Sequence, residues 1–253
     1  MTPHNRRHLR RGALAFAAAV ALATTGGAGA AVAAPGDTHY YIEAGGLGAT
    51  ADAPTCTRSY GYANQSLDGG IAQPVCYSAS AGPFIGIHNE APAPNAPSMD
   101  ASVAEGYRNM LAKAEATHQA DPGARITIVG YSLGAWVADL VLQRIAKGDT
   151  GIPRSQVDGM LYADPLQPGT GIWAKIPKGV GLFGITSPGP GPVHFDGIPV
   201  QRFCIHRDGV CDATSIESFP GYLTEHPTYP RDNGIVEQTI ARDGTDGITW
   251  YDN

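Results

Sequence analysis

A serine between two glycines is the first feature of this sequence that could do chemistry. Gly130-Tyr131-Ser132-Leu133-Gly134 follows the apolar run at 125–129 and precedes a stretch whose apolar residues recur at helical spacing. A Gly-x-Ser-x-Gly pattern between a buried strand and a helix is typical of a nucleophile elbow, because small flanking residues let the backbone turn sharply and expose the hydroxyl. A helix-capping serine in a glycine-rich turn is the alternative. Strand, pattern and helix together favour the elbow.

A serine hydroxyl becomes a good nucleophile only when a neighbouring base removes its proton. The elbow hypothesis therefore requires an acid and a histidine further along the chain, in the order serine, acid, histidine. Asp208 lies in the segment between Cys204 and Cys211, and His226 follows it. Both required side chains are therefore available in the required order.

Other carboxylates compete with Asp208 for the role of the acid. Asp164 ends a predicted strand and precedes a proline, but it lies one strand earlier than the usual acid position, so we interpret it as structural. Asp196 and Asp212 are lesser alternatives. His206 precedes Asp208, which breaks the expected order, and we interpret it as a surface or packing residue.

Strands and helices alternate along the chain, which implies an α/β fold with a central, mostly parallel sheet covered by helices on both faces. The run at 125–129 is apolar almost throughout, as in a parallel strand that is buried on both faces. Apolar spacing and Gly/Pro punctuation predict strands at 39–43, 82–87, 125–129, 157–163 and 200–204, and helices at about 102–118, 135–145 and 235–242.

The N-terminus has the features of an export signal: four arginines, an apolar stretch at 13–23, and small residues ending in Ala31-Val32-Ala33. Cleavage after Ala33 would leave residues 34–253 as a single domain. Arg6-Arg7 is compatible with the twin-arginine route as well as with the ordinary secretory route. The apolar stretch is shorter than the roughly 18 residues that span a bilayer. We therefore expect a secreted or cell-wall protein without a transmembrane segment.

Charge excludes one class of partner. The formal net charge is −6, and it becomes −10 without residues 1–33, because that segment holds four arginines and no acidic residue. An acidic chain without a basic cluster is poorly suited to nucleic acid or to an anionic membrane surface. No nucleic-acid partner is expected.

The four cysteines all follow the predicted signal, and an even number in an exported chain favours disulfides. Three pairings are possible, and proximity favours Cys56 with Cys76 and Cys204 with Cys211. A zinc site lacks the usual Cys-x2-Cys spacing and a nearby histidine pair. Gly46-x-Gly48 matches a dinucleotide fingerprint only weakly, because Pro54 interrupts the helix that should follow. No metal or cofactor is expected.

The motifs resemble those of the cutinase superfamily, which includes related actinobacterial serine-hydrolase domains and phage mycolyl esterases. The Gly-Tyr-Ser-x-Gly elbow, the Cys-x3-Asp-x2-Cys loop and the His-x2-Tyr segment occur in the same order with similar separations, from about residue 126 to 229. The resemblance implies an α/β-hydrolase-like three-layer sandwich. It also implies that Ser132 is the nucleophile, Asp208 the orienting acid and His226 the general base.

The same resemblance predicts an oxyanion hole made of the backbone N–H groups of Leu133 and Leu47. The amide after the nucleophile lies at a helix N-terminus, which suits a developing negative charge. Leu47 ends Ala44-Gly45-Gly46-Leu47, which looks like the oxyanion loop of the superfamily. Cutinases usually carry a hydroxyl residue in that loop and Gln after the nucleophile, whereas this chain has leucine in both places.

The function expected from these features is a serine esterase or lipase that hydrolyses carboxylic esters of lipids, polyesters or the cell envelope. Trp173, Leu182 and Phe183 are candidates for the walls of an acyl pocket or for a flap, with ordinary core packing as the alternative. A hydrophobic ester is the expected partner of a monomeric enzyme. An acyltransferase that uses a sugar hydroxyl, and a non-catalytic cell-surface binding protein, are the alternative functions.

Overall fold

The structure is a computed structural model, and it describes residues 38–49, 55–242 and 244–252 of the 253-residue chain. The predicted export signal and the cleavage point after Ala33 lie outside the described residues. Within the described part, no helix is long and apolar enough to cross a membrane.

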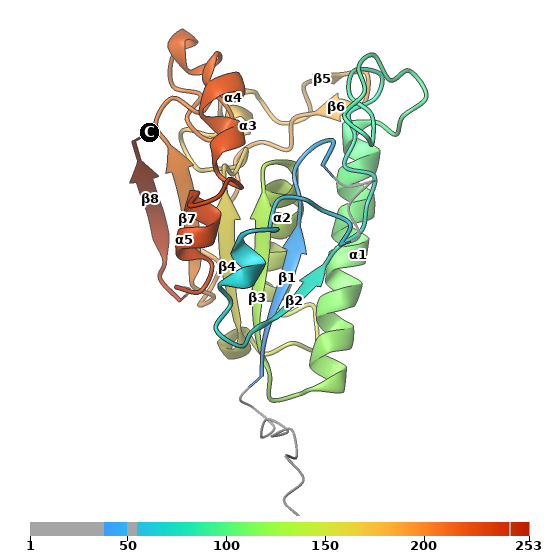
Figure 1. Cartoon of the computed structure of the whole chain (residues 1–253). Helices are drawn as coiled ribbons and strands as arrows, with labels where there is room; N and C mark the ends of the chain where they lie inside the picture. Colours follow the sequence, from blue (N-terminus) through green and yellow to red (C-terminus); the bar gives the residue numbers. More distant parts are fainter. Residues whose placement is uncertain (1–37, 50–54, 243, 253) are drawn as a thin grey trace, which may run out of the picture. The chain divides into compact units, whose positions relative to one another are not determined.

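Six strands form one central sheet, and every neighbouring pair of strands runs parallel. Their carboxyl ends therefore meet at the same edge (Figure 1). The spatial order is β2-β1-β3-β4-β7-β8, so the chain changes direction across the sheet between β1 and β3. In open α/β sheets ligands bind at such a switch point. The strands are β1 (His39–Ala44), β2 (Ile71–Pro74), β3 (Arg125–Tyr131), β4 (Val157–Tyr162), β7 (Val200–Ile205) and β8 (Gly247–Tyr251).

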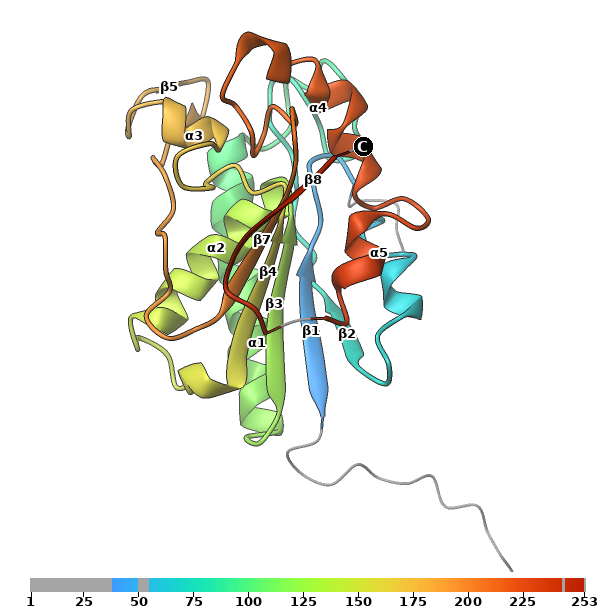
Figure 2. The same ribbon diagram turned by 90° about the vertical axis from the view of Figure 1, so that its left-hand side faces the viewer.

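Helices cover both faces of this sheet. Helices α1 (Met99–Ala120) and α2 (Leu133–Ala146) lie on one face, and the short helices η1 (Ala63–Gln65) and α5 (Ile235–Thr239) lie on the other (Figure 2). The arrangement confirms the predicted α/β-hydrolase-like three-layer sandwich with a parallel sheet. The remaining short elements are η2 (Arg154–Gln156), α3 (Ile172–Lys175), the hairpin β5 (Gly181–Leu182) and β6 (Ile185–Thr186), η3 (Ile216–Ser218), α4 (Gly221–Thr224) and η4 (His226–Thr228).

Two apolar cores hold the layers together, one on each face of the sheet. The larger core fills the space under α1 and α2 and includes Ile128, Trp136 and Leu142. The second core lies under η1 and α5, where the rings of Tyr162 and Phe203 stack with centroids 4.6 Å apart. Residues along β3 alternate between the two cores, so a strand buried on both faces reads as the continuous apolar run seen in the sequence.

A buried arginine connects three of these elements. Arg202 of β7 donates from Nε to Asp164, which follows β4, at 2.8 Å, and from Nη2 to Asp139 of α2 at 2.9 Å. The same Nη2 also donates to the Pro192 carbonyl oxygen at 3.0 Å. Burial, and then the neighbouring Asp164 carboxylate, raises the pKa of Asp139 to about 7. Removing one member of such a buried network is costly, because it leaves a charge without its partner.

Two edge strands were not predicted, and one predicted strand is absent. Residues 82–87 form only an isolated bridge between Ala81 and Ile85, because Gly82 and Pro83 interrupt the run. The edge strand next to β1 is β2, a four-residue segment that ends in a proline. Strand β8 lies beyond β7, so residues 200–204 are not the last strand. The predicted terminal helix at 235–242 already ends at Thr239.

Glu43 of β1 is a buried carboxyl group on the side of the sheet that carries the second core. The side chain is fully buried, Asn64 Nδ2 donates to Oε2 at 3.0 Å, and burial raises the pKa of Glu43 to about 8 from its ordinary value of 4.5. A raised pKa means that the folded state binds the proton more tightly than the unfolded state does. Glu43 therefore contributes stability below its unfolded pKa, and that contribution is lost as the pH rises through about 8.

We expect the free energy of unfolding to fall less between about pH 5 and pH 9 in Glu43→Gln than in wild type. A difference of one between the folded-state and unfolded-state pKa corresponds to about 1.4 kcal/mol. Urea unfolding at a series of pH values measures this slope. The exposed Glu90→Gln serves as the matched control and should keep the wild-type slope. An unchanged slope in Glu43→Gln would show that Glu43 does not hold its proton in the folded protein.

Candidate active site

Ser132 lies at the sharp turn between β3 and α2. Its φ of 58° and ψ of −119° are an unusual conformation for a residue with a side chain. The two flanking glycines make the turn possible, because a Cβ at Gly130 would lie 2.3 Å from the Gly134 carbonyl oxygen, and a Cβ at Gly134 would lie 2.0 Å from that of Ala44. The Gly-x-Ser-x-Gly spacing is thus required by the backbone.

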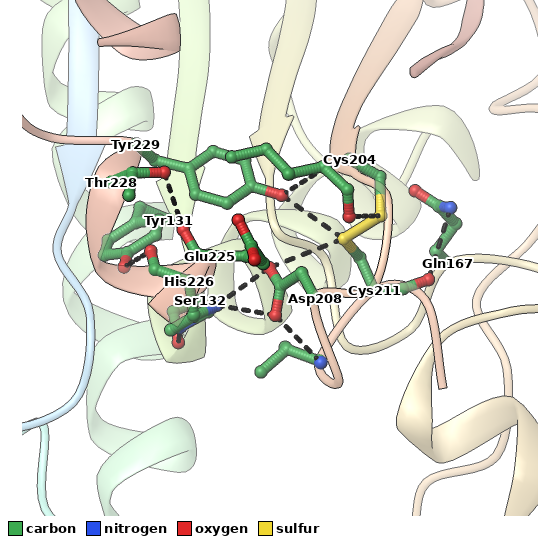
Figure 3. A network of polar contacts seen from close by, with 12 residues as sticks. Tyr131, Ser132, Gln167, Cys204, Asp208, Cys211, Glu225, His226, Thr228 and Tyr229 are labelled. Carbon is green, nitrogen blue, oxygen red and sulfur yellow. Dashed lines mark hydrogen bonds and ion pairs between the residues drawn. A yellow bond between two sulfur atoms is a disulfide. The ribbon is translucent and has the colours of Figure 1, made fainter. Parts of the chain in front are cut away.

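His226 and Asp208 come from two loops beyond the carboxyl ends of the strands. His226 Nε2 lies 2.8 Å from Ser132 Oγ, and Nδ1 lies 2.9 Å from Asp208 Oδ2 and 3.1 Å from Oδ1 (Figure 3). Asp208 is fully buried, and the exposed fractions of Ser132 and His226 are only 8% and 6%. These contacts can carry a proton from a serine hydroxyl to an imidazole that a carboxylate orients.

The loop that holds Asp208 follows β7 and is closed by a disulfide between Cys204 and Cys211. The Val210 backbone N–H donates to Asp208 Oδ1 at 3.0 Å. Tyr229 Oη accepts the Ile205 N–H at 2.7 Å and so fixes the end of the strand. Cys56 is bonded to Cys76, so both bridges have the pairing that proximity in the sequence favours.

The other carboxylates and histidines considered from the sequence have different partners. Asp164 binds Arg202 and accepts the Leu166 N–H at 2.9 Å. Asp212 accepts the Arg207 N–H at 2.8 Å, and the ring of His206 stacks on Trp250. The structure thus brings Asp208, rather than Asp164 or Asp212, against His226.

Two backbone N–H groups are available beside Ser132. Leu133 is the first residue of α2, so its N–H lies at the positive end of the helix. Leu47 follows Gly46, where a Cβ would lie 3.4 Å from the Ser132 Cβ. The Tyr77 hydroxyl holds this loop by donating to the Gly45 carbonyl oxygen at 2.5 Å. Within the described residues, neither the Leu47 N–H nor the Leu133 N–H donates a hydrogen bond to the protein.

An apolar cavity of about 330 Å³ opens beside Ser132. Trp173 lines it, as does Trp136, whose ring meets that of Trp173 edge-on with centroids 5.3 Å apart. Sequence reasoning missed Trp136, although it lies one helical turn after Ser132 and so faces the same side. Leu47, Leu133, Phe84 and Tyr222 also line the cavity.

Leu182 and Phe183 do not line this cavity. Their exposed fractions are 68% and 61%, and they lie at the turn of the β5–β6 hairpin. Phe183 contacts the edge of the Phe84 ring, with centroids 6.0 Å apart. Because Phe84 and Ile185 line the cavity, the hairpin reaches its rim, while Leu182 and Phe183 themselves are largely exposed. Leu182 and Phe183 are therefore not walls of this cavity. The other role predicted for them, a flap, stays a prediction.

The described residues contain no evident metal-binding site. No group of three or more His, Cys, Asp or Glu side chains is arranged there to hold a metal ion. The four cysteines are paired in disulfides.

The family model described as PE-PPE domain matches residues 71–216, which is more than half of the chain. The chain belongs to the PE-PPE domain family. The matched residues of this PE-PPE domain include Ser132 and Asp208 and end before His226. Over 163 residues the chain is 26% identical to an uncharacterized PPE family protein, PPE28, of Mycobacterium tuberculosis. The match covers 64% of this chain and only 22% of that protein.

A solved structure at a TM-score above 0.5 shows the same fold. A cutinase-like protein from Cryptococcus sp. superimposes with a TM-score of 0.54 at 17% identity, covering 83% of this chain and 94% of the other. The catalytic core domain of an acetyl xylan esterase from Trichoderma reesei gives a TM-score of 0.48 at 17% identity, covering 77% and 96%. The resemblance to the cutinase superfamily is confirmed at the level of the fold.

The geometry predicts a reactive serine. A small organophosphonate ester should label Ser132 with one equivalent, because His226 can take the hydroxyl proton as the phosphorus–oxygen bond forms. We expect no labelling in Ser132→Ala, and labelling slower by roughly 10²-fold in His226→Gln. Intact-mass spectrometry with peptide mapping measures both. Equal labelling of wild type and Ser132→Ala would contradict the assignment.

Proposed function

We propose that this chain is a secreted serine hydrolase of carboxylic esters, with a lipid, a polyester or a cell-envelope acyl ester as substrate. The observation that carries the proposal is the contact of Ser132 with His226, and of His226 with Asp208, at the mouth of an apolar cavity. Two disulfides are in keeping with an oxidising, extracellular location. The sequence of the N-terminus predicts the export itself.

In the proposed reaction Ser132 Oγ attacks the ester carbonyl carbon, while His226 Nε2 takes the hydroxyl proton. The tetrahedral intermediate collapses and the carbon–oxygen bond to the alcohol breaks. His226 gives its proton to the leaving alkoxide, so the alcohol departs neutral. Water then attacks the acyl-enzyme, His226 accepts its proton and returns it to Ser132 Oγ, and the carboxylic acid leaves.

Asp208 and the two free amides stabilise the charges that develop. The Asp208 carboxylate accepts the Nδ1–H of His226, which holds the imidazole with Nε2 towards Ser132. The N–H groups of Leu47 and Leu133 would donate to the oxyanion. Removing a single such donor in a serine hydrolase costs about 10²–10³ in kcat. With leucine at both positions, the hole depends on main-chain donors alone.

The cavity favours an apolar acyl group. Its lining includes Leu133, Trp136 and Trp173, and burying apolar atoms of a ligand is worth about 25 cal/mol per Å². Two of the residues that line the cavity, Phe84 and Tyr222, are also partly exposed, with exposed fractions of 48% and 41%. Exposed apolar groups beside a catalytic cavity suit an oily substrate better than a sugar or a peptide.

Hydrolysis of p-nitrophenyl esters of increasing acyl length by residues 34–253 tests the proposal. We expect kcat/KM to rise from acetate towards medium-length chains, because the added methylenes enter the apolar cavity, and then to level off once the cavity is full. Ser132→Ala should lose at least about 10³-fold in kcat. Absence of turnover with every ester, in folded wild-type protein, would count against an esterase.

The same assay separates the two carboxylates. Asp208→Ala should lower kcat by about 10²–10⁴, because the imidazole loses its orienting partner. Asp164→Ala should cost about 3–5 kcal/mol of stability, because buried Arg202 loses a carboxylate partner and the Leu166 N–H loses its acceptor, with kcat of the folded variant within about tenfold of wild type. Thermal unfolding of both variants provides the control. The opposite pattern would make Asp164 the acid.

A further inference from the structure

Two tyrosine rings stack on the imidazole of His226. The Tyr131 ring lies with its centroid 5.1 Å from that of His226 at an interplanar angle of 24°. The Tyr222 ring lies at 5.2 Å and 26°. Near-parallel contacts of this kind restrict rotation of the imidazole about its Cβ–Cγ bond. They act in addition to the hydrogen bonds at the two ring nitrogens.

The two tyrosines hold His226 in different ways. Tyr131 is buried inside the elbow, and its hydroxyl donates to the His226 carbonyl oxygen at 2.6 Å. Tyr222 belongs to α4, four residues before His226, and 41% of it is exposed. Within the described residues the Tyr222 side chain has ring contact with His226 but makes no hydrogen bond. Its role therefore depends on the ring itself.

Tyr222 also lines the apolar cavity. One ring thus touches both the base of the proposed reaction and the space that a substrate would fill. An acyl ester in the cavity would contact the Tyr222 ring. The same ring packs against His226. Among the described residues that line the cavity, Tyr222 alone packs an aromatic ring against the His226 imidazole.

We propose that Tyr222 is a positioning residue, which aligns the His226 imidazole and stabilises it while it carries the proton taken from Ser132. The inference rests on the proposed esterase function. An imidazole that gains a proton becomes a cation, and the face of an aromatic ring attracts a cation most strongly where water is excluded. Without the ring, His226 would be more exposed to water, and only Tyr131 and the hydrogen bonds at its two ring nitrogens would restrict its rotation.

A cavity wall without this role would behave differently. If Tyr222 only contacted the acyl chain, removing its ring would weaken substrate binding, so KM would rise with kcat nearly unchanged. A residue that aligns the general base acts after binding. Removing its ring lowers kcat for every ester, including acetate, whose acyl group is too short to need the cavity.

The experiment compares Tyr222→Leu, which keeps an apolar side chain but removes the ring, with Tyr222→Phe, which keeps the ring and removes the hydroxyl. Kinetics with p-nitrophenyl acetate should show kcat lower by roughly tenfold in Tyr222→Leu, with a smaller change in KM. Tyr222→Phe should restore most of kcat. Leu223→Ala, at the highly exposed neighbouring position of α4, is the matched control and should keep the wild-type kcat.

NMR spectra of histidine-labelled protein give a readout that does not require turnover. The imidazole C–H resonances of His226, assigned by their loss in His226→Gln, should move in Tyr222→Leu as the ring-current shift disappears, and should stay near their wild-type positions in Tyr222→Phe. A change in KM alone, or equal loss of kcat in both Tyr222 variants, would overturn the inference. Wild type that hydrolyses no ester would instead overturn the proposed function, and the resonances would still report the stacking.

Discussion

The backbone of strand β1 and the first turn of helix α2 lie so close together that no side chain fits between them. A Cβ at Gly134 would lie 2.0 Å from the Ala44 carbonyl oxygen, and one at Gly130 would meet Gly134 itself. This contact forces the turn that gives Ser132 its positive φ. The same close approach brings the loop that contains Leu47 beside the N-terminus of α2, so one steric constraint affects both Ser132 and the backbone N–H groups of Leu47 and Leu133.

Other interactions hold Asp208 in place. Arg202 connects β7 to α2 and to the segment after β4, so the strand that leads to Asp208 keeps its place relative to the helix that follows Ser132. The Cys204–Cys211 disulfide then closes the short loop in which Asp208 lies. Buried ionic networks are poor sources of net stability but define one arrangement of the elements they connect. In this protein, that arrangement brings Asp208 next to His226.

The sequence predicted the central part of this protein better than its edges. Strands β1, β3, β4 and β7 are rich in apolar, aromatic or β-branched residues, and the elbow pattern has a steric cause, so both could be predicted from residue types. Strand β2 is four residues long and ends in proline, and only alternate residues of β8 are shielded, so neither stood out. Leu182 and Phe183 have the composition of a pocket wall, but whether an apolar side chain is buried depends on tertiary contacts that the sequence does not contain. Tyr222 was missed for the same reason.

Burial of the site has opposite effects on the two halves of an acyl-enzyme reaction. Asp208, His226 and Ser132 are almost fully shielded, which strengthens each fixed hydrogen bond and would favour the charged intermediate. In the proposed reaction, deacylation would nevertheless need a water molecule next to Nε2, and an acyl chain in the apolar cavity would occupy the space on that side of Ser132. Water would then come from the side of Tyr222, which is partly exposed. The partly exposed Tyr222 ring, which stacks on the imidazole and lines the cavity, would therefore lie between the apolar cavity and solvent.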